Sequence, residues 1–303
     1  MDIRTDLALE LRDGVIEKEK RKLEDVDFAE SVEGECKITK IKIGKDSEET
    51  IGCAAGNYVT VEFARFGAAD TEKFAFLCEI LVRELSVLIA GKTKSFPKKV
   101  LVACLGNADI SADALGPLTA KSLIVTGHLK KLDREIFESF GSVELTALSL
   151  GVMAQTGIES ADIIKSVVAK TKPEAVIAVD ALSSRELSRL ASTLQLSDAG
   201  ICPGSGIGNF RSALNEQTLG VPVFSIGVPT MVEISALVCD ALKMLSLTCD
   251  GNVREKLGKN GRLLVAPKDS AIIIADLAKL IGFAIDKTFI KDLDYSEIAR
   301  LTS

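Results

Sequence analysis

Short apolar runs alternate with amphipathic helical segments from about residue 57 to residue 285. The clearest runs, at residues 99–105 and 175–179, are almost continuously apolar, as expected of strands that are buried on both faces. Strands that alternate with helices favour a mainly parallel sheet with helices on both sides. We therefore expect an α/β fold with a mainly parallel, twisted sheet flanked by helices and right-handed connections.

The remaining apolar patterns extend this arrangement along the chain. Further strands are predicted at residues 58–64, 143–150, 193–196, 221–226 and 263–266. Helices are predicted at residues 74–89, 115–132, 159–170, 231–247 and 270–285. No linker rich in Pro, Gly or Ser interrupts the pattern, which favours a single domain. Half of the first 50 residues are charged, so residues 7–50 are interpreted as a charged arm, either a solvated helix or a mobile segment.

Composition narrows the compartment and the partners. With 303 residues, 47% of them hydrophobic, the chain can bury a sizeable core. A net charge of −6 argues against binding to nucleic acid or to an anionic membrane surface. No apolar run approaches the roughly 18 residues of a spanning helix, and the N-terminus lacks the apolar segment of a secretory signal. We expect a cytoplasmic protein with no nucleic-acid or membrane partner.

The scarcity of histidine limits the possible chemistry. His128 is the sole histidine, so sites with several histidines are impossible and a histidine-based nucleophilic dyad would have to use it. It ends a predicted helix, where a partly charged imidazole suits the helix dipole, and we interpret it as structural. The seven cysteines form no CxxC pair, which is typical of reduced intracellular thiols. Cys202 lies in a glycine-rich loop without a nearby base, so carboxylates are the better candidates for catalysis.

Two carboxylates follow predicted strands. Asp113 lies in the loop 105–117, and Asp180 ends the strand at residues 175–179. In open α/β sheets ligands bind beyond the carboxyl ends of the strands, so both side chains are candidates to face one crevice. Asp113 is equally compatible with a helix N-cap, and Asp180 with a structural role through loop amides or Arg185.

Two further loops are candidates for a site. The segment CPGSGIGN, residues 202–209, contains GxGxG but not the full dinucleotide signature. Its amides could form a nest for an oxyanion or a phosphate, or the loop could simply be flexible. The candidate donors are Gly204, Ser205, Gly206 and Gly208. In the loop 151–160, Gln155 and Thr156 either cap the next helix or face the crevice.

Taken together, six segments in order resemble the germination protease (spore protease) family, and the resemblance spans nearly the whole chain. The segments are RTDLALE, LGNADISADALGP, GVMAQTGIES, VDALSSRELSRLASTLQLSDAGICPGSGIGN, TLGVPVFSIGVPT and APKDSAIIIADLAKLIGFAID. The resemblance implies a cytosolic endopeptidase of the forespore and germinating spore that degrades small acid-soluble, DNA-coating spore proteins. It also implies a homotetramer, a zymogen with a short prosegment, and a fold like that of the hydrogenase-maturation peptidases (phosphorylase/hydrolase-like).

The resemblance also implies which residues act. The family's catalytic carboxylates match Asp113 and Asp180, and Gly106-Asn107 with Asp113 and Gly116 resembles a loop of the hydrogenase-maturation peptidases. In the mechanism we expect, the two carboxyl groups share one proton, the ionised one activates water, and the protonated one bonds the peptide carbonyl. The pair titrates as a unit, so neither residue has a fixed role. Glycine-loop amides around Gly204 stabilise the oxyanion, and no cofactor is required.

The first residues resemble a substrate of the same family. Thr5-Asp6-Leu7-Ala8 has the acidic, then apolar, then Ala pattern at which the family cuts spore proteins. We expect residues 1–6 to be a prosegment that the enzyme itself removes between Asp6 and Leu7, which leaves residues 7–303 as one peptidase domain. Two alternatives stay open. One is a metal-sensing peptidase of the hydrogenase-maturation kind, against which the single His128 counts. The other is a phosphate- or nucleotide-binding module that uses the CPGSGIGN loop.

Overall fold

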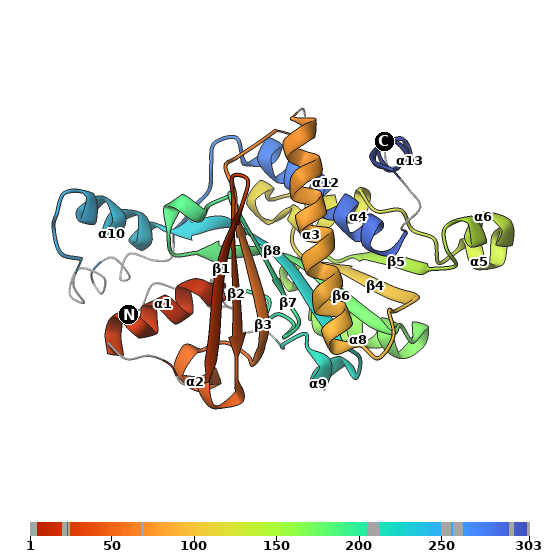
Figure 1. Ribbon diagram of the computed structural model, residues 1–303, viewed down its shortest axis with the longest axis horizontal. Coiled ribbons are helices and arrows are strands. Elements are labelled where there is room, and N and C mark those ends of the chain that lie inside the picture. Colours follow the sequence, from red (N-terminus) through yellow and green to blue (C-terminus); the bar gives the residue numbers. More distant parts are fainter. Residues whose placement is uncertain are drawn as a thin grey trace.

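The computed structural model of the protein describes residues 5–19, 23, 25–67, 70–204, 212–249, 256, 263–290 and 294–301. Its centre is a nine-stranded sheet in the order β1-β2-β3-β7-β8-β6-β4-β5, with β9 paired to β8 (Figure 1). The strands are β1 (Val26–Glu33), β2 (Cys36–Ile43), β3 (Gly56–Glu62), β4 (Lys99–Cys104), β5 (Glu144–Ser149), β6 (Ala175–Ser184), β7 (Thr193–Ser197), β8 (Val223–Glu233) and β9 (Leu264–Val265).

Helices connect and cover the strands. The α-helices are α1 (Ala8–Glu19), α2 (Glu48–Ile51), α3 (Thr71–Lys92), α4 (Leu115–Lys121), α5 (Leu129–Leu132), α6 (Arg134–Ser139), α7 (Met153–Thr156), α8 (Ser160–Thr171), α9 (Glu216–Leu219), α10 (Ile234–Met244), α12 (Ser270–Phe289) and α13 (Tyr295–Leu301). Three 3-10 turns are η1 (Lys45–Ser47), η2 (Ser111–Asp113) and η3 (Leu187–Arg189). Within the described residues, every helix is too short or too polar to cross a membrane.

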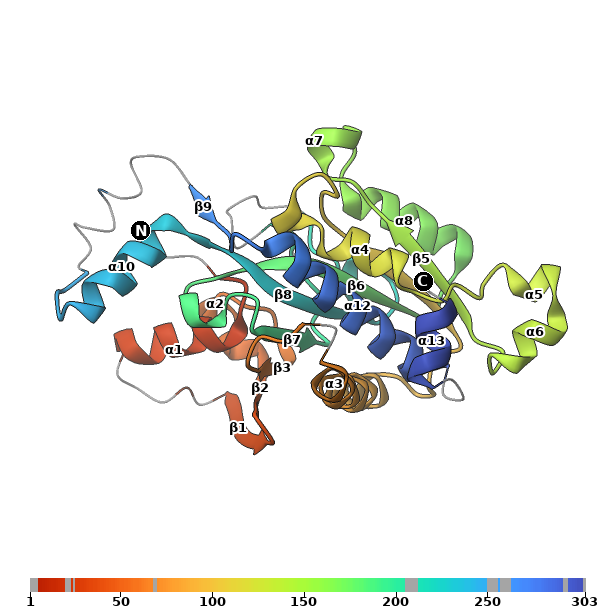
Figure 2. The same ribbon diagram turned by 90° about the horizontal axis from the view of Figure 1, so that it is seen from above.

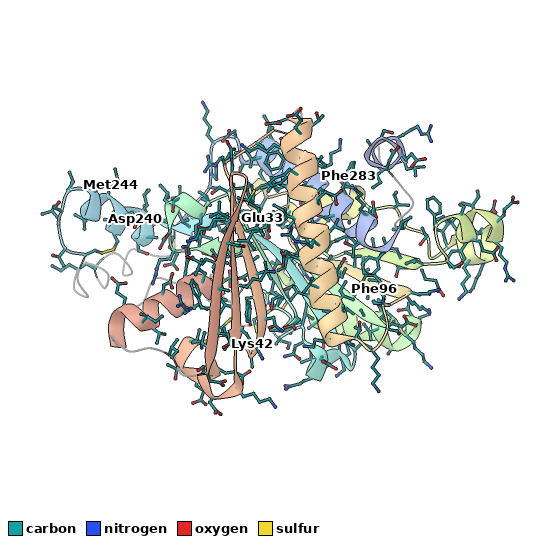
Figure 3. All side chains as sticks on the ribbon, viewed as in Figure 1. Glu33, Lys42, Phe96, Asp240, Met244 and Phe283 are labelled. Carbon is teal, nitrogen blue, oxygen red and sulfur yellow. A yellow bond between two sulfur atoms is a disulfide. The ribbon has the colours of Figure 1, made fainter. Side chains whose placement is uncertain are left out.

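One half of the sheet, formed by β8, β6, β4 and β5, is parallel and covered on both faces. Val100 and Val102 of β4 pack into a core that α3, α4 and α12 complete, whereas Leu101 packs with α8 and α9 on the other face. Figure 2 shows α8 on the side of the sheet away from α3. Between the covering helices, Phe283 of α12, which is labelled in Figure 3, meets Phe74 of α3 edge-on, and the ring centroids are 5.4 Å apart. The predicted α/β fold with a helix-flanked sheet is confirmed here.

The other half of the sheet, formed by β1, β2, β3 and β7, is antiparallel, so the prediction of a mainly parallel sheet holds for one half only. The interpretation of residues 7–50 as a charged arm holds only in part. A helix forms at α1, but its first turn is buried, and the described residues after it form the β1–β2 hairpin and α2. Ile41 and Ile43 of β2 are buried with Ala8 and Leu9 of α1. Lysines alternate with these isoleucines, so a high average charge hides a period-two strand pattern.

Three smaller expectations differ from the structure. The predicted helix 115–132 is interrupted after α4, and the exposed His128 precedes α5 instead of ending a long helix. Strands β6 and β8 extend well beyond their predicted ends because they pair with each other past the end of β4. Not all cysteines are free, since Cys239 of α10 and Cys249 form a disulfide.

Candidate active site

The loop between β4 and α4 positions Asp113, which lies in η2 and is half-buried. The amide of Asn107 donates to the main-chain oxygen and to Oδ2 of Asp113, both at 3.0 Å, so the loop closes on itself. Gly106 permits this closure, because a Cβ there would lie 2.1 Å from the Asp113 main-chain oxygen and its φ is +121°. A Cβ on Gly116 would likewise lie 2.1 Å from the Leu105 oxygen. The two glycines therefore fix where the Asp113 carboxylate lies.

Asp180 lies on β6, which is the neighbour of β4. The last pair between the two strands joins Cys104 to Val179, so Asp180 is the first β6 residue beyond the carboxyl end of β4. The chain leaving β4 starts beside it, since the amide of Leu105 donates to the Val179 oxygen at 2.8 Å. Asp180 is 6% exposed, and its Oδ1 accepts a hydrogen bond from the amide of Ala181 at 2.9 Å. The sequence placed both carboxylates at this edge of the sheet, and the structure brings them to it.

Asp113 and Asp180 line one cavity together with Asp6 from the N-terminal segment. The rest of the wall comes from the loops after β4, β5 and β7, from β6 itself and from β8; the residues include Gly106, Val152, Ser160, Ala181, Pro203, Gly204 and Met231. The free volume is about 60 Å³. That volume holds a few water molecules but no peptide chain. The cavity is therefore closed to a peptide while Asp6 occupies it.

The N-terminal segment is bound to the end of β6. The amide of Asp6 donates to the Ser183 oxygen at 2.9 Å, and the amide of Ser183 donates to Oδ2 of Asp6 at 2.8 Å. The hydroxyl of Thr5 also donates to the Ser183 oxygen, at 3.3 Å. Leu7 and Ala8, which follow, are 0% exposed. The chain thus passes from the cavity directly into the core.

Gln195 of β7 holds the same segment from the other side. Its Oε1 accepts from the amide of Ala8 at 2.8 Å, and its Nε2 donates to the main-chain oxygen of Asp6 at 3.1 Å. The side chain is 7% exposed. The amide group of Gln195 therefore bonds the backbone on both sides of Leu7.

Glu10, in the first turn of α1, anchors this segment to the loop after β6. Its carboxylate accepts from the amides of Arg185 at 2.6 Å and Glu186 at 3.0 Å, and lies 3.5 Å from the guanidinium of Arg189. Burial raises the pKa of Glu10, and these hydrogen bonds and the nearby guanidinium oppose the rise. The amide of Arg185, a residue that the sequence offered as a partner for Asp180, is thus bonded to Glu10.

The glycine-rich loop is described only at its start. Gly204 lines the cavity, whereas Ser205, Gly206 and Gly208 lie outside the described residues, so the oxyanion and phosphate roles predicted for this loop stay predictions. Cys202 keeps contact with solvent, yet the surrounding loops remove enough water to raise the pKa of its thiol, and the carboxylate of Asp6 adds to the rise. A raised pKa disfavours the thiolate, which counts against Cys202 as a nucleophile.

Two side chains tie the Asp113 loop to its neighbours. Gln155 of α7 donates to Oδ1 of Asn107 at 2.7 Å, and Thr230 of β8 donates to the main-chain oxygen of Ala112 at 2.6 Å. The sequence offered Gln155 as a candidate to face the crevice, but it did not single out Thr230 or Gln195. A usable signal was present, because each of these two polar residues lies between apolar neighbours in a strand and is itself buried.

No three His, Cys, Asp or Glu side chains lie close enough together to hold a metal ion in the part of the chain that the structure describes.

Comparisons of the sequence with known proteins all point to one family. A family model described as germination protease matches residues 4–256. A germination protease from Clostridium tetani is 34% identical to the chain over 98% of both proteins. One from Priestia megaterium is 37% identical over 87% of this chain and 72% of its own length.

Other relatives are longer than the chain. A germination protease from Oceanobacillus iheyensis is 39% identical over 79% of this chain, and the match covers 66% of the relative. Among solved structures, the [NiFe] hydrogenase maturation protease HycI from Thermococcus kodakarensis aligns with 68% of this chain and 98% of its own, at 16% identity and a TM-score of 0.38.

Proposed function

Because the chain belongs to the germination protease family, and is therefore a spore germination peptidase, we propose that Asp113 and Asp180 are its catalytic pair. We also propose that its substrates are the small acid-soluble proteins that coat spore DNA. One observation supports the pair above all others. Asp113 lies in the loop that follows β4, Asp180 is the first residue of the neighbouring parallel strand β6 beyond the end of β4, and both carboxylates line the same cavity.

The proposed mechanism uses water as the nucleophile. Two carboxyl groups that face one small cavity do not readily ionise together, so the pair holds one shared proton. The ionised member takes a proton from water, and the water oxygen attacks the peptide carbonyl carbon. The protonated member bonds the carbonyl oxygen and later gives its proton to the leaving amine. Amides of the loop that begins at Gly204 remain the proposed oxyanion donors from the glycine-rich segment.

We further propose that the chain is a zymogen cut between Asp6 and Leu7. The position of Thr5 and Asp6 supports this. Asp6 is bonded to Ser183 and lines the cavity, and the space left beside it holds only water molecules. Removal of residues 1–6 would free the Ser183 main chain for a substrate. A homotetramer acting in the cytoplasm of the forespore and spore core completes the proposal, without a nucleic-acid or membrane partner.

The test uses Asp113→Asn and Asp180→Asn in the full chain, with a purified small acid-soluble spore protein as substrate. Asn keeps the shape of the side chain but cannot share the proton, so each variant should lose at least about 1,000-fold in turnover. Asp109→Asn is the matched control, because Asp109 is an exposed carboxylate in the same loop that accepts from Gln155. Product masses identify the cut bonds. Near wild-type turnover by either folded variant of the pair would remove that residue from the mechanism.

A further inference from the structure

We infer that Gln195 binds substrate through two hydrogen bonds of its side-chain amide. One bond goes to the carbonyl oxygen of the cleaved peptide bond, and the other comes from the main-chain N–H of the second residue after the cut. The inference rests on the proposed function and on a cut between Asp6 and Leu7. In the structure the N-terminal segment occupies the position that we assign to a substrate. Leu7 and Ala8 stay on the chain after the cut and are 0% exposed here, so they must leave this position before a substrate binds. Asp6 then stands for the residue before the cut, and Ala8 for the second residue after it.

The orientation of the Gln195 amide is fixed by its partners. The main-chain N–H of Ala8 can only donate, so the atom facing it at 2.8 Å is the oxygen Oε1. The nitrogen Nε2 then faces the main-chain oxygen of Asp6 at 3.1 Å. A Gln side chain carries the same donor and acceptor as a peptide unit, so these two bonds reproduce those that a neighbouring strand makes.

The position of Gln195 favours a role in binding over a role in packing. Thr193 and Ser197, which share its face of β7, are 0% and 1% exposed, and Gln195 itself is 7% exposed. A buried side-chain amide needs hydrogen-bond partners to offset its loss of water. Both polar atoms of Gln195 bond to the segment that includes Asp6, and one of these bonds goes to the carbonyl oxygen of the bond proposed to be cut. A donor at that oxygen polarises the carbonyl and stabilises the negative charge that develops on it.

The surrounding contacts define the class of peptide. The amide of Ser183 binds the carboxylate of the residue before the cut, and the residue after it is enclosed completely. A second cavity of about 410 Å³, lined in part by Gln195, shares Asp6 and Leu182 with the catalytic cavity. It offers space for more of the substrate chain. The site therefore suits an extended peptide with an acidic residue, a cut, an aliphatic residue and then a small one.

The experiment compares two synthetic peptides that contain Thr-Asp-Leu-Ala, using the full chain after self-processing, with the loss of residues 1–6 verified by intact mass for each variant. In the second peptide an ester replaces the amide between Leu and Ala, which removes only the N–H that Oε1 accepts. Wild-type protein should cleave the ester peptide with a kcat/KM about tenfold lower, as expected for one lost hydrogen bond. Gln195→Leu should cleave the amide peptide at least about tenfold more slowly and should not distinguish the two peptides.

Gln195→Glu tests the two hydrogen bonds of this side chain separately. It keeps the acceptor for the amide but replaces the donor, so it should still distinguish the peptides while kcat falls. Thr193→Val, on the same strand and equally buried, should behave as wild type. If the folded Gln195→Leu protein discriminates against the ester as wild type does, the inference is overturned while the proposed function stands. If wild-type protein cleaves neither peptide nor any spore protein, the proposed function fails and the inference fails with it.

Discussion

The two halves of the sheet contribute different parts of the site. The parallel half, drawn with β4 and β5 on the right of Figure 1, supplies Asp113 and Asp180 at the ends of its strands. The antiparallel half adds peptide contacts, through Gln195 on β7 and through the core that α1 forms with β2 and β3, to those that Ser183 makes at the end of β6. The cavity lies where the halves meet, because β7 pairs with β8 and β8 with β6. The proposed catalytic pair and the contacts of Gln195 can therefore be changed separately by mutation.

The halves also differ in how firmly they hold their functional groups. Asp113 belongs to a loop that two tightly packed glycines close, and Asp180 lies in β6 where that strand pairs with β8, one residue past its last pair with β4. The segment with Thr5 and Asp6 is held at Ser183 and Gln195 by hydrogen bonds to its own backbone and side chains. A different peptide can make the backbone bonds equally well. Under the proposed function, a firmly held edge that carries the catalytic pair is thus combined with a peptide segment that a substrate replaces.

The largest loss of activity is expected from a substitution that displaces the Asp113 loop. In Gly106→Ala the new Cβ would lie 2.1 Å from the Asp113 oxygen at a φ of +121°, so the loop must move. We expect at least about a 100-fold loss of peptidase activity, because small displacements of a catalytic group have effects of this size. Gly141→Ala is the control, with φ +73° but nothing within 4 Å of the added carbon. It should cost about 1 kcal/mol of stability and no activity. Equal activity losses in the two variants would show that closure of the Asp113 loop is unimportant.

A smaller effect, on the pH dependence of stability, is expected from two buried carboxyl groups. Asp286 lies beside the parallel half of the sheet, and Glu10 lies beside the antiparallel half. Asp286 of α12 accepts at both oxygens from the amide of Ile124, and burial raises its pKa well above the ordinary value of 3.8. The folded state therefore binds this proton more tightly than the unfolded state. The free energy of unfolding should fall as pH rises from about 4 through the folded-state pKa, by up to about 1.4 kcal/mol per pH unit.

Asp286→Asn should flatten that dependence, as measured by urea unfolding at several pH values. Glu10→Gln is the matched comparison in the other half. Burial raises the pKa of Glu10 as well, but two backbone hydrogen bonds and Arg189 oppose the rise. Glu10→Gln should therefore flatten the pH dependence of stability less than Asp286→Asn does. A stability curve that is equally steep in Asp286→Asn and in wild type would contradict the assignment.

The smallest effect is expected at Cys202. It lines the second cavity beside Asp6, but its raised pKa disfavours a thiolate, and the proposed mechanism uses no thiol. Cys202→Ser should keep turnover within about twofold of wild type. Complete loss of activity in the folded variant, together with inactivation by alkylation of Cys202, would instead favour a cysteine nucleophile.

The same comparison explains what the sequence could predict. Strands of the parallel half are buried on both faces, so their residues, such as 99–105, form almost continuous apolar runs. Such runs can be recognised in the sequence alone. Asp113 and Asp180 follow such runs, and their place at the sheet edge could be predicted. In the antiparallel half, lysines at Lys40 and Lys42 alternate with buried isoleucines, and the charge of the segment concealed the strand. Gln195 could not be assigned, because its role depends on a partner 187 residues away in the chain.

The central claim is that the seated N-terminal segment is cut by the carboxylates it faces. Intact mass measurement of the full-length protein during incubation tests this directly, with Asp180→Asn run in parallel. We predict that wild-type protein loses residues 1–6 and gains Leu7 as its N-terminus, while Asp180→Asn keeps its mass. A wild-type N-terminus that never changes under conditions of full peptidase activity, or a cut between Asp6 and Leu7 in purified Asp180→Asn, would contradict the account.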